Sequence, residues 1–296
     1  MSSELLIAVL GGGGAMLGWG IADFFAKKTV DKIGDVKTLF WAQAFGIIPI
    51  FVYYLFNFSL PVITLSTILG LLFYASLDGF GYILFYKALE KGKVSIISPV
   101  VAAYAAFAVL ISAIFLKETL TLSILLGIGI VFIGIMLTSL DFKGLRDASI
   151  DKKDIVKGIP EALVAVVLFS IWFPFWDKFV SSGDWLVLVL GLRIAISLIV
   201  LSYAKVTKEG VSIKDSSLWK WLLVIGLFDG GAYITLTWGF GATTLTSVVS
   251  VLSAAFSLPT LILARIFLKE KLQPAQWLGV LSIIGGLVWL SFVGGH

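Results

Sequence analysis

Three charged residues lie in the middle of long apolar runs of this sequence: Asp78, Arg193 and Asp229. A charge at the centre of a lipid bilayer costs at least a few kcal/mol even on lenient insertion scales, so each of them needs a partner or water. Two carboxylates against one guanidinium leave one acid unmatched, free to exchange a proton or to meet a cationic group of a solute. The trio therefore indicates a polar binding or coupling site, with an ion pair that only holds helices together as the alternative.

Neighbouring polar and aromatic residues extend this candidate site. Each acid is followed four residues later by a tyrosine, and Gln43 stands where the second half of the chain has Arg193. Three tryptophans lie deep inside apolar runs, where an aromatic ring either lines a cavity or fills the core. We therefore take nine residues as candidates for substrate binding or coupling: Asp78, Asp229, Arg193, Gln43, Tyr82, Tyr233, Trp19, Trp172 and Trp238.

Other residues have structural interpretations. Asp23 and Lys27 are four residues apart, so we expect them to share a helix face and to form a local ion pair. Asp177 and Lys178 end an apolar run, so we expect them at the membrane interface. The small residues from Gly11 to Gly18 predict a face of close helix packing.

Several kinds of chemistry are excluded by composition. The chain has no cysteine, and its one histidine is His296, so disulfides, thiolate catalysis and multi-histidine metal sites are ruled out. Proton chemistry inside the membrane must therefore use carboxylates. We see no nucleotide-binding loop and no nucleophile with a base, and we expect no enzyme activity, no catalytic residues, no cofactor and no metal. The net charge of +4 comes from lysines beside apolar runs, which favours lipid headgroups over nucleic acid as the partner.

The elements that position these residues are membrane helices. Of 296 residues, 59% are apolar and only 14% charged, and the mean hydropathy is +1.05, which is outside the range of soluble domains. Apolar runs long enough to cross about 30 Å of hydrocarbon predict an all-α integral membrane protein. The ten predicted transmembrane helices cover 5–26, 36–56, 64–86, 94–116, 120–139, 158–179, 185–204, 217–240, 245–267 and 273–293.

The sequence repeats itself. When residues 95–139 are aligned without gaps on residues 247–291, 14 of the 45 pairs are identical, where composition alone gives roughly a tenth. A second block, starting at Asp78, aligns with the segment that starts at Asp229. We therefore expect a first repeat over 1–139, a polar linker over 140–157 and a second repeat over 158–296.

Charge shows how the repeats are oriented. The connections after the odd-numbered predicted helices hold 18 basic residues, whereas those after the second, fourth, sixth and eighth hold only Lys117 and Lys178. An odd number of helices per repeat requires the two copies to be inverted, and the charge bias switches accordingly between them. By the positive-inside rule the linker is expected in the cytoplasm and both termini outside.

Paired motifs carry a resemblance to a known family. Each half has a Phe-Leu-Lys-Glu turn before a glycine-bearing last helix, ending in Lys117-Glu118 and in Lys269-Glu270, and Trp19-Gly20 lies early in the first helix. Over nearly its whole length the chain resembles the drug/metabolite transporter superfamily, in particular its ten-helix EamA-like members. The resemblance implies a substrate cavity between the halves, lined by the first four helices of each. It also implies cytoplasmic termini, opposite to the orientation that the charges predict.

Together these features predict a secondary transporter. We expect it to move a small metabolite, such as an amino acid, a sugar or a related polar or amphipathic solute, by alternating access, either proton-coupled or by exchange. We place it as a multi-pass protein in the plasma membrane, as a monomer or a homodimer, with a small-molecule substrate and the lipid bilayer as partners. The alternatives are a channel or structural membrane subunit and, further away, an intramembrane enzyme.

Overall fold

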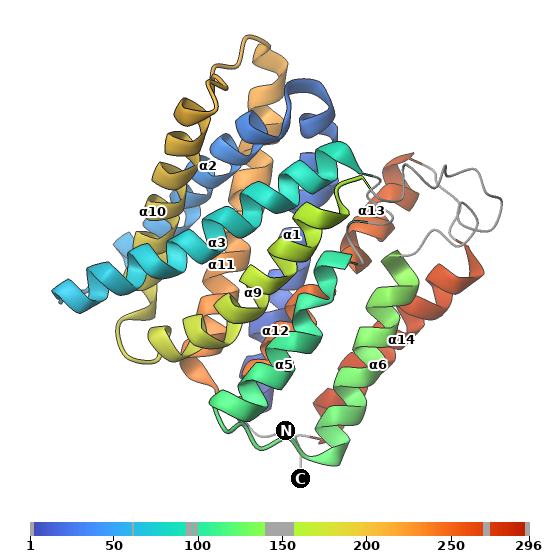
Figure 1. Ribbon diagram of the computed structural model, residues 1–296. Helices are drawn as coiled ribbons and strands as arrows, with labels where there is room; N and C mark the ends of the chain where they lie inside the picture. The colour runs from blue at the N-terminus through green and yellow to red at the C-terminus, as the bar shows by residue number, and fades with distance from the viewer. Residues whose placement is uncertain are drawn as a thin grey trace.

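The computed structural model describes residues 3–60, 62–92, 97, 100–139, 157–268 and 273–293, and every regular element in these ranges is helical (Figure 1). The predicted linker over 140–157 lies almost wholly outside the described residues. The all-α class is thus confirmed. In chain order the helices are α1 (Ser3–Ile33), α2 (Asp35–Phe56), α3 (Leu65–Lys91), α5 (Tyr104–Phe115), α6 (Leu122–Ser139), α9 (Ile159–Val180), α10 (Trp185–Val206), the short η1 (Ser216–Leu218), α11 (Trp219–Ala242), α12 (Thr246–Ala254), α13 (Ser257–Leu268) and α14 (Pro274–Val293).

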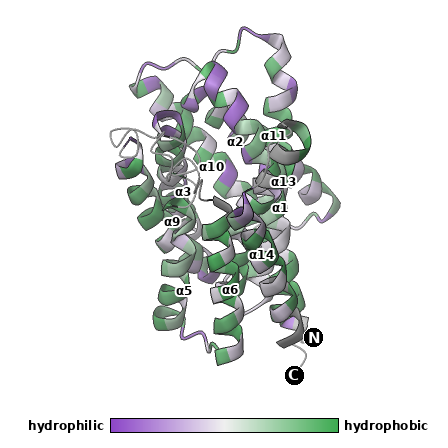
Figure 2. Cartoon of the chain, turned by 90° about the vertical axis from the view of Figure 1, so that its right-hand side faces the viewer, coloured by the Kyte–Doolittle hydropathy of each residue, from purple (hydrophilic) through white to green (hydrophobic). Residues whose placement is uncertain are grey.

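The helices have the length and composition of membrane spans. Six of them are long and apolar enough to cross a bilayer, and four shorter apolar helical stretches cover Val100–Phe115, Leu122–Leu137, Thr246–Thr260 and Pro274–Leu290. Many large apolar side chains on α2, α3, α6 and α14 are exposed, as expected where lipid is the solvent. Figure 2 shows hydrophobic residues along the helices and hydrophilic ones in the connections at their ends. The chain is therefore a multi-pass membrane protein.

Two predicted helix ends are wrong. The first helix continues to Ile33 and the third to Lys91, beyond the predicted ends at residues 26 and 86. An apolar window stops at the first lysines, but the backbone stays helical where charged side chains reach water and pair along the helix. Lys27, for example, forms an ion pair of 2.7 Å with Asp31, one turn further on.

The predicted helix over 245–267 is also wrong, because it is broken in two. α12 ends at Ala254 and α13 begins at Ser257. Pro259 favours the break, because it has no N–H to donate to the carbonyl of Ala255, four residues earlier, and this carbonyl accepts from the Leu258 amide instead (2.9 Å). In the first half, α5 begins at Tyr104 after a turn at Ala103, and Ala103 is the position that aligns with Ala255. Both repeats therefore interrupt the same helix at the same place.

The two halves are interleaved. α1 packs against α11 and α3 against α9, while α2 lies beside both α10 and α11. α1 crosses α11 so closely that a Cβ added at Gly11 would lie 2.7 Å from the Cα of Gly239. The face of close packing predicted from Gly11 to Gly18 is thus confirmed. Helices of opposite halves enclose the centre of the bundle.

The last helices of the two halves, α6 and α14, pack on each other at the side of the bundle (Figure 1). Their glycines make reciprocal contacts: a Cβ on Gly134 would lie 2.8 Å from the carbonyl oxygen of Gly279, and one on Gly286 would lie 3.2 Å from that of Gly127. Gly127 aligns with Gly279, and Gly134 with Gly286. The contact thus has the form of a twofold axis between the repeats.

The connections gather at two ends of the bundle. At one end, Trp41 Nε1 at the start of α2 donates to the carbonyl of Val211 after α10 (2.8 Å), and Lys91 at the end of α3 pairs with Glu161 at the start of α9 (2.6 Å). At the other end, Thr244 donates to Glu4 at the start of α1 (2.9 Å). The first end is the one whose connections are rich in lysine.

Candidate functional site

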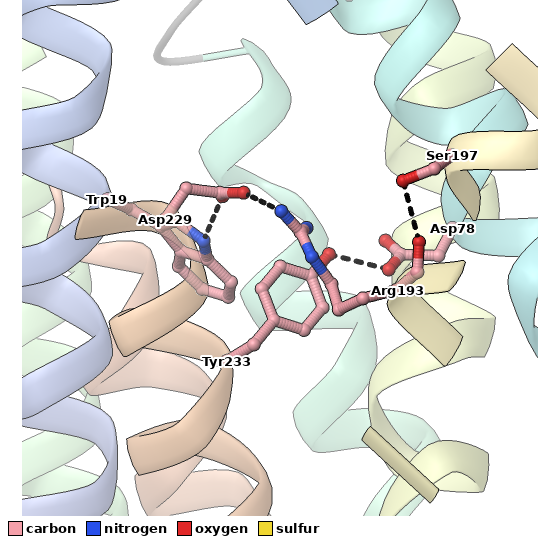
Figure 3. A network of polar contacts seen from close by, with 6 residues as sticks. All are labelled: Trp19, Asp78, Arg193, Ser197, Asp229 and Tyr233. Carbon is pink, nitrogen blue, oxygen red and sulfur yellow. Dashed lines mark hydrogen bonds and ion pairs between the residues drawn. The ribbon is translucent and has the colours of Figure 1, made fainter. Parts of the chain in front are cut away.

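A chain of polar contacts crosses the centre of the bundle (Figure 3). Trp19 Nε1 on α1 donates to Asp229 Oδ1 on α11 (3.1 Å), and Asp229 Oδ2 forms an ion pair with Arg193 on α10. The Arg193 guanidinium lies over the Tyr233 ring, 4.6 Å from its centroid, and the Tyr233 hydroxyl donates to Asp78 Oδ2 on α3 (2.6 Å). Five of the candidates thus form one network that joins the two halves.

Arg193 is the anchor of this network. Its side chain is fully buried, which is costly for a charge unless it is paired, and Asp229 supplies the pairing. Gly46 on α2 leaves the space for it, since a Cβ at that position would lie 2.1 Å from the Arg193 Nη2. The guanidinium nitrogens Nε and Nη1 have no hydrogen-bond partner among the described residues. The ion pair expected from sequence is therefore present, and it uses Asp229 and not Asp78.

A cavity lies beside the network. Its described lining consists of Trp19, Asp23, Asp78, Tyr82, Phe85, Val101, Tyr104, Phe169, Trp172, Phe173, Tyr233 and Phe256. Its volume of about 40 Å³ has room for a few water molecules and is far below the several hundred Å³ of a typical ligand pocket. In this conformation the cavity is too small for a metabolite, so a solute enters only when the helices around it move.

Both helix breaks face this cavity. Val101 and Tyr104, on either side of the turn at Ala103, contribute to its wall from the first half, and Phe256, at the break before α13, contributes from the second. On the other side of the second break, Gly20 lies close enough that an added Cβ would meet the Phe256 carbonyl oxygen at 2.4 Å. Interrupted helices at the centre of a bundle are typical of the sites where transporters bind solutes and ions.

The structure brings most of the predicted site residues together. Trp19, Asp78, Tyr82, Trp172 and Tyr233 line the cavity, and Arg193 and Asp229 lie directly behind it. Gln43 is buried, with an Oε1 that has no partner among the described residues, and Trp238 is half-buried. Neither of these two is among the described residues of the lining.

The sequence interpretation missed one acid of the cavity. Asp23 lines the wall and makes no hydrogen bond or ion pair within the described part of the chain, whereas its expected partner Lys27 pairs with Asp31 instead. The predicted pair of Asp23 with Lys27 is therefore wrong, because both acids lie four residues from Lys27 and the exposed one is easier to reach. The sequence contains an indication of this position, because Asp23 follows Trp19 by one helical turn and therefore lies on the same face of the helix.

A second cluster of acids lies at the end of the bundle opposite the lysine-rich connections. Asp177, near the end of α9, is buried and accepts a hydrogen bond from Thr246. Glu118, in the connection between α5 and α6, accepts hydrogen bonds from the Ser247 hydroxyl (2.8 Å) and backbone amide (3.1 Å) in the first turn of α12. Burial raises the pKa of Glu118 to about 7, in spite of these hydrogen bonds, which lower it. The cluster fixes the start of α12.

Interleaved inverted halves, ionisable residues gathered inside an apolar bundle and broken helices around a central cavity define a multi-pass membrane protein of the solute-carrier kind. The family model of the EamA-like transporter family matches residues 6–140 and, a second time, residues 156–292. The chain belongs to this family and is a membrane transporter of the drug/metabolite transporter superfamily. The expected family and the inverted repeat are thus confirmed.

Two further comparisons found similar proteins. An uncharacterized protein of Methanocaldococcus jannaschii is 37% identical over 125 residues, which make up 41% of this chain and 88% of that protein. A crystal structure of another protein superposes with a TM-score of 0.78 at 17% sequence identity, covering 97% of this chain and 98% of that one. At this identity the second likeness concerns the fold alone.

Proposed function

We propose that this protein is a secondary transporter with ten membrane spans that moves a small metabolite across the plasma membrane by alternating access. The solute is an amino acid, a sugar or a related polar or amphipathic molecule. It binds in the central cavity between the halves and is released to either side as the halves move against each other. Transport is driven by a proton gradient or by exchange.

The observation that carries this proposal is the small central cavity between the two repeats. Acids from α1 and α3 and aromatic rings from both halves meet there, at a volume of about 40 Å³ that excludes any metabolite. A channel needs a continuous pore, whereas a carrier rearranges its helices around a central site, and a cavity of this size requires such a rearrangement before a metabolite fits. The two helix breaks beside the cavity supply points where helices bend without unfolding.

Asp78 is our candidate for the coupling residue. Asp229 is held by a guanidinium and by the Trp19 indole, whereas the described partner of Asp78 is the neutral hydroxyl of Tyr233. A carboxylate bound to a neutral group keeps the freedom to gain and lose a proton or a cationic partner as the cavity opens to each side.

Counterflow in proteoliposomes tests the function. Solutes that raise the thermal stability of the purified protein are selected first, and labelled solute is then added outside vesicles loaded with the unlabelled one. A carrier accumulates label transiently above equilibrium and saturates, whereas a channel only equilibrates it. Repeating the assay with a pH step separates proton coupling, which changes the rate, from pure exchange, which does not respond. If no stabilising solute shows counterflow, the proposal fails.

A further inference from the structure

Two carboxylates face the central cavity and no described cation does. Asp23 and Asp78 are in its wall. The guanidinium that acts on this cluster belongs to Arg193, which is fully buried, paired with Asp229 and outside the described lining. Lys27, one turn from Asp23, is turned to Asp31. Within the described part of the chain, three acids therefore share one base, and the two acids that face the cavity are left without an ionic partner.

The rest of the wall is aromatic. Tyr82 packs edge-on against Phe169, with ring centroids 5.5 Å apart, and Tyr104 stacks on Phe173 at 4.5 Å. Trp19 and Trp172 meet Tyr233 at 5.6 and 6.1 Å. Ring faces attract cations and at the same time bury apolar surface. Acids within an aromatic wall suit one chemical class, a positive group attached to an apolar body.

Resting on the proposed transport function, we propose that the solute is a small organic amine without a carboxylate. Its ammonium lies between Asp23 and Asp78, and its apolar part lies against the aromatic wall. A cation at this place supplies the counter-charge that the two cavity-facing acids lack. The attraction between them is strongest where water is excluded. A carboxylate on the solute would face two like charges, and Arg193, the base that would attract it, is enclosed behind the wall. Free amino acids are therefore disfavoured, and the class proposed above narrows.

A competing account is that both acids carry protons and that the cavity takes a neutral solute. Three probes of similar shape separate the two accounts: phenethylamine carries the ammonium, 2-phenylethanol replaces it by a hydroxyl, and phenylalanine adds a carboxylate. Their affinities for the purified protein at neutral pH are measured from thermal stability as a function of probe concentration. We expect phenethylamine to bind at least about tenfold more tightly than either of the other two.

Three matched variants locate the binding site. Asp23→Asn loses no bond to a described residue, and Asp78→Asn keeps an oxygen for the Tyr233 hydroxyl, so both should fold with little change in thermal stability without probe. Each of these two variants is expected to weaken the binding of phenethylamine by about tenfold or more. Glu4→Gln changes an exposed acid of the same helix α1, keeps an oxygen for the Thr244 hydroxyl and should leave the affinity unchanged. Uptake of labelled phenethylamine into proteoliposomes should follow the same order.

Each of the following results would overturn the proposal. Equal binding of 2-phenylethanol means a neutral solute, and tighter binding of phenylalanine means that a carboxylate is recognised. If the affinity for phenethylamine is unchanged in both Asp23→Asn and Asp78→Asn, the probe binds elsewhere. If phenethylamine has no effect while another solute shows saturable counterflow, the substrate class is wrong and the transport function stands. If no solute shows counterflow, the transport function itself fails.

Discussion

Arg193 illustrates how a membrane protein accommodates a buried charge. Its guanidinium is paired with Asp229 on the neighbouring helix, lies against the face of Tyr233 and occupies the space beside Gly46. None of these features is sufficient alone, because a charge in lipid needs a counter-charge, and the pair needs space without a strain on the helices. The three acids therefore differ in position: Asp229 is paired with the arginine, whereas Asp78 and Asp23 face the cavity.

Removing the charge of Asp229 should destabilise the protein. Asp229→Asn leaves the Arg193 guanidinium buried without a counter-charge, and we expect the free energy of unfolding to fall by about 3 to 5 kcal/mol. Asp78→Asn should cost far less, because its described hydrogen bond survives the change. Chemical denaturation in detergent micelles measures both. The double variant Arg193→Gln with Asp229→Asn should recover part of the loss, and a double variant no more stable than Asp229→Asn would contradict the ion pair's structural role.

Glu118 should make stability depend on pH. Its folded-state pKa of about 7 is above the ordinary value of 4.5, so the folded state favours the protonated carboxyl. The resulting stability is fully present below about pH 4.5 and is lost as the pH rises through 7, by ~3 kcal/mol at most. Glu118→Gln, which keeps an oxygen for Ser247, should remove this dependence. The thermal stability of the two proteins is measured at pH 5 and at pH 8. Relative to the wild type, Glu118→Gln should be more stable at pH 8 than at pH 5. The same difference in stability at both pH values would refute the assignment.

Among the elements, the broken helix between α12 and α13 links a sequence feature directly to the cavity. Pro259 leaves the Ala255 carbonyl without its helical donor, and the break places Phe256 in the cavity wall. A break in the helix that lines the site lets its two parts tilt separately. Stability and transport should therefore respond to Pro259 in opposite directions.

Replacing this proline should stiffen the helix and slow transport. Pro259→Ala restores an N–H four residues after Ala255, and we expect a gain of up to about 3 kcal/mol in the free energy of unfolding, reduced by lost packing of the ring against Gly20. Counterflow should slow at the same time. Pro174→Ala, in the interior of the unbroken α9, is the matched control and should leave the counterflow rate near that of the wild type. Counterflow at the wild-type rate in Pro259→Ala would show that the break is static.

The elements also show what sequence reasoning can and cannot reach. Hydropathy located the helices because lipid demands long apolar runs, and the repeat located Asp78 and Asp229 because related residues align. Hydropathy gives 245–267 as one helix, and Pro259 within it indicates a possible bend without showing that the helix divides at Ala255. Phe169, Phe173 and Tyr104 were missed as wall residues, since every span carries aromatic rings and only the packing decides which of them face a cavity. Asp23 was missed because two acids competed for one lysine.

At the scale of the whole molecule, orientation in the membrane can be tested directly. The lysine-rich connections lie at one end of the bundle, so the positive-inside rule places the loop after α10 in the cytoplasm and the loop after α2 outside. The chain lacks cysteine, so single substitutions report without background. Asn57→Cys and Ser212→Cys change exposed residues at opposite ends. In intact cells an impermeant maleimide should label Asn57→Cys and not Ser212→Cys, and the reverse pattern would give the cytoplasmic termini that the family resemblance implies.

The reciprocal glycine contacts between α6 and α14 are those of a symmetric dimer, although both helices belong to one polypeptide. Two copies of a half-length chain, inserted in opposite directions, would make the same contact, and the archaeal relative is about the length of one half. In such a dimer every substitution appears twice. Two arginines would then enter the centre together, or none would. Fusion into one gene frees each half to change alone, so a single Arg193 can stand opposite the neutral Gln43, and a site with one positive and several negative groups becomes accessible to evolution.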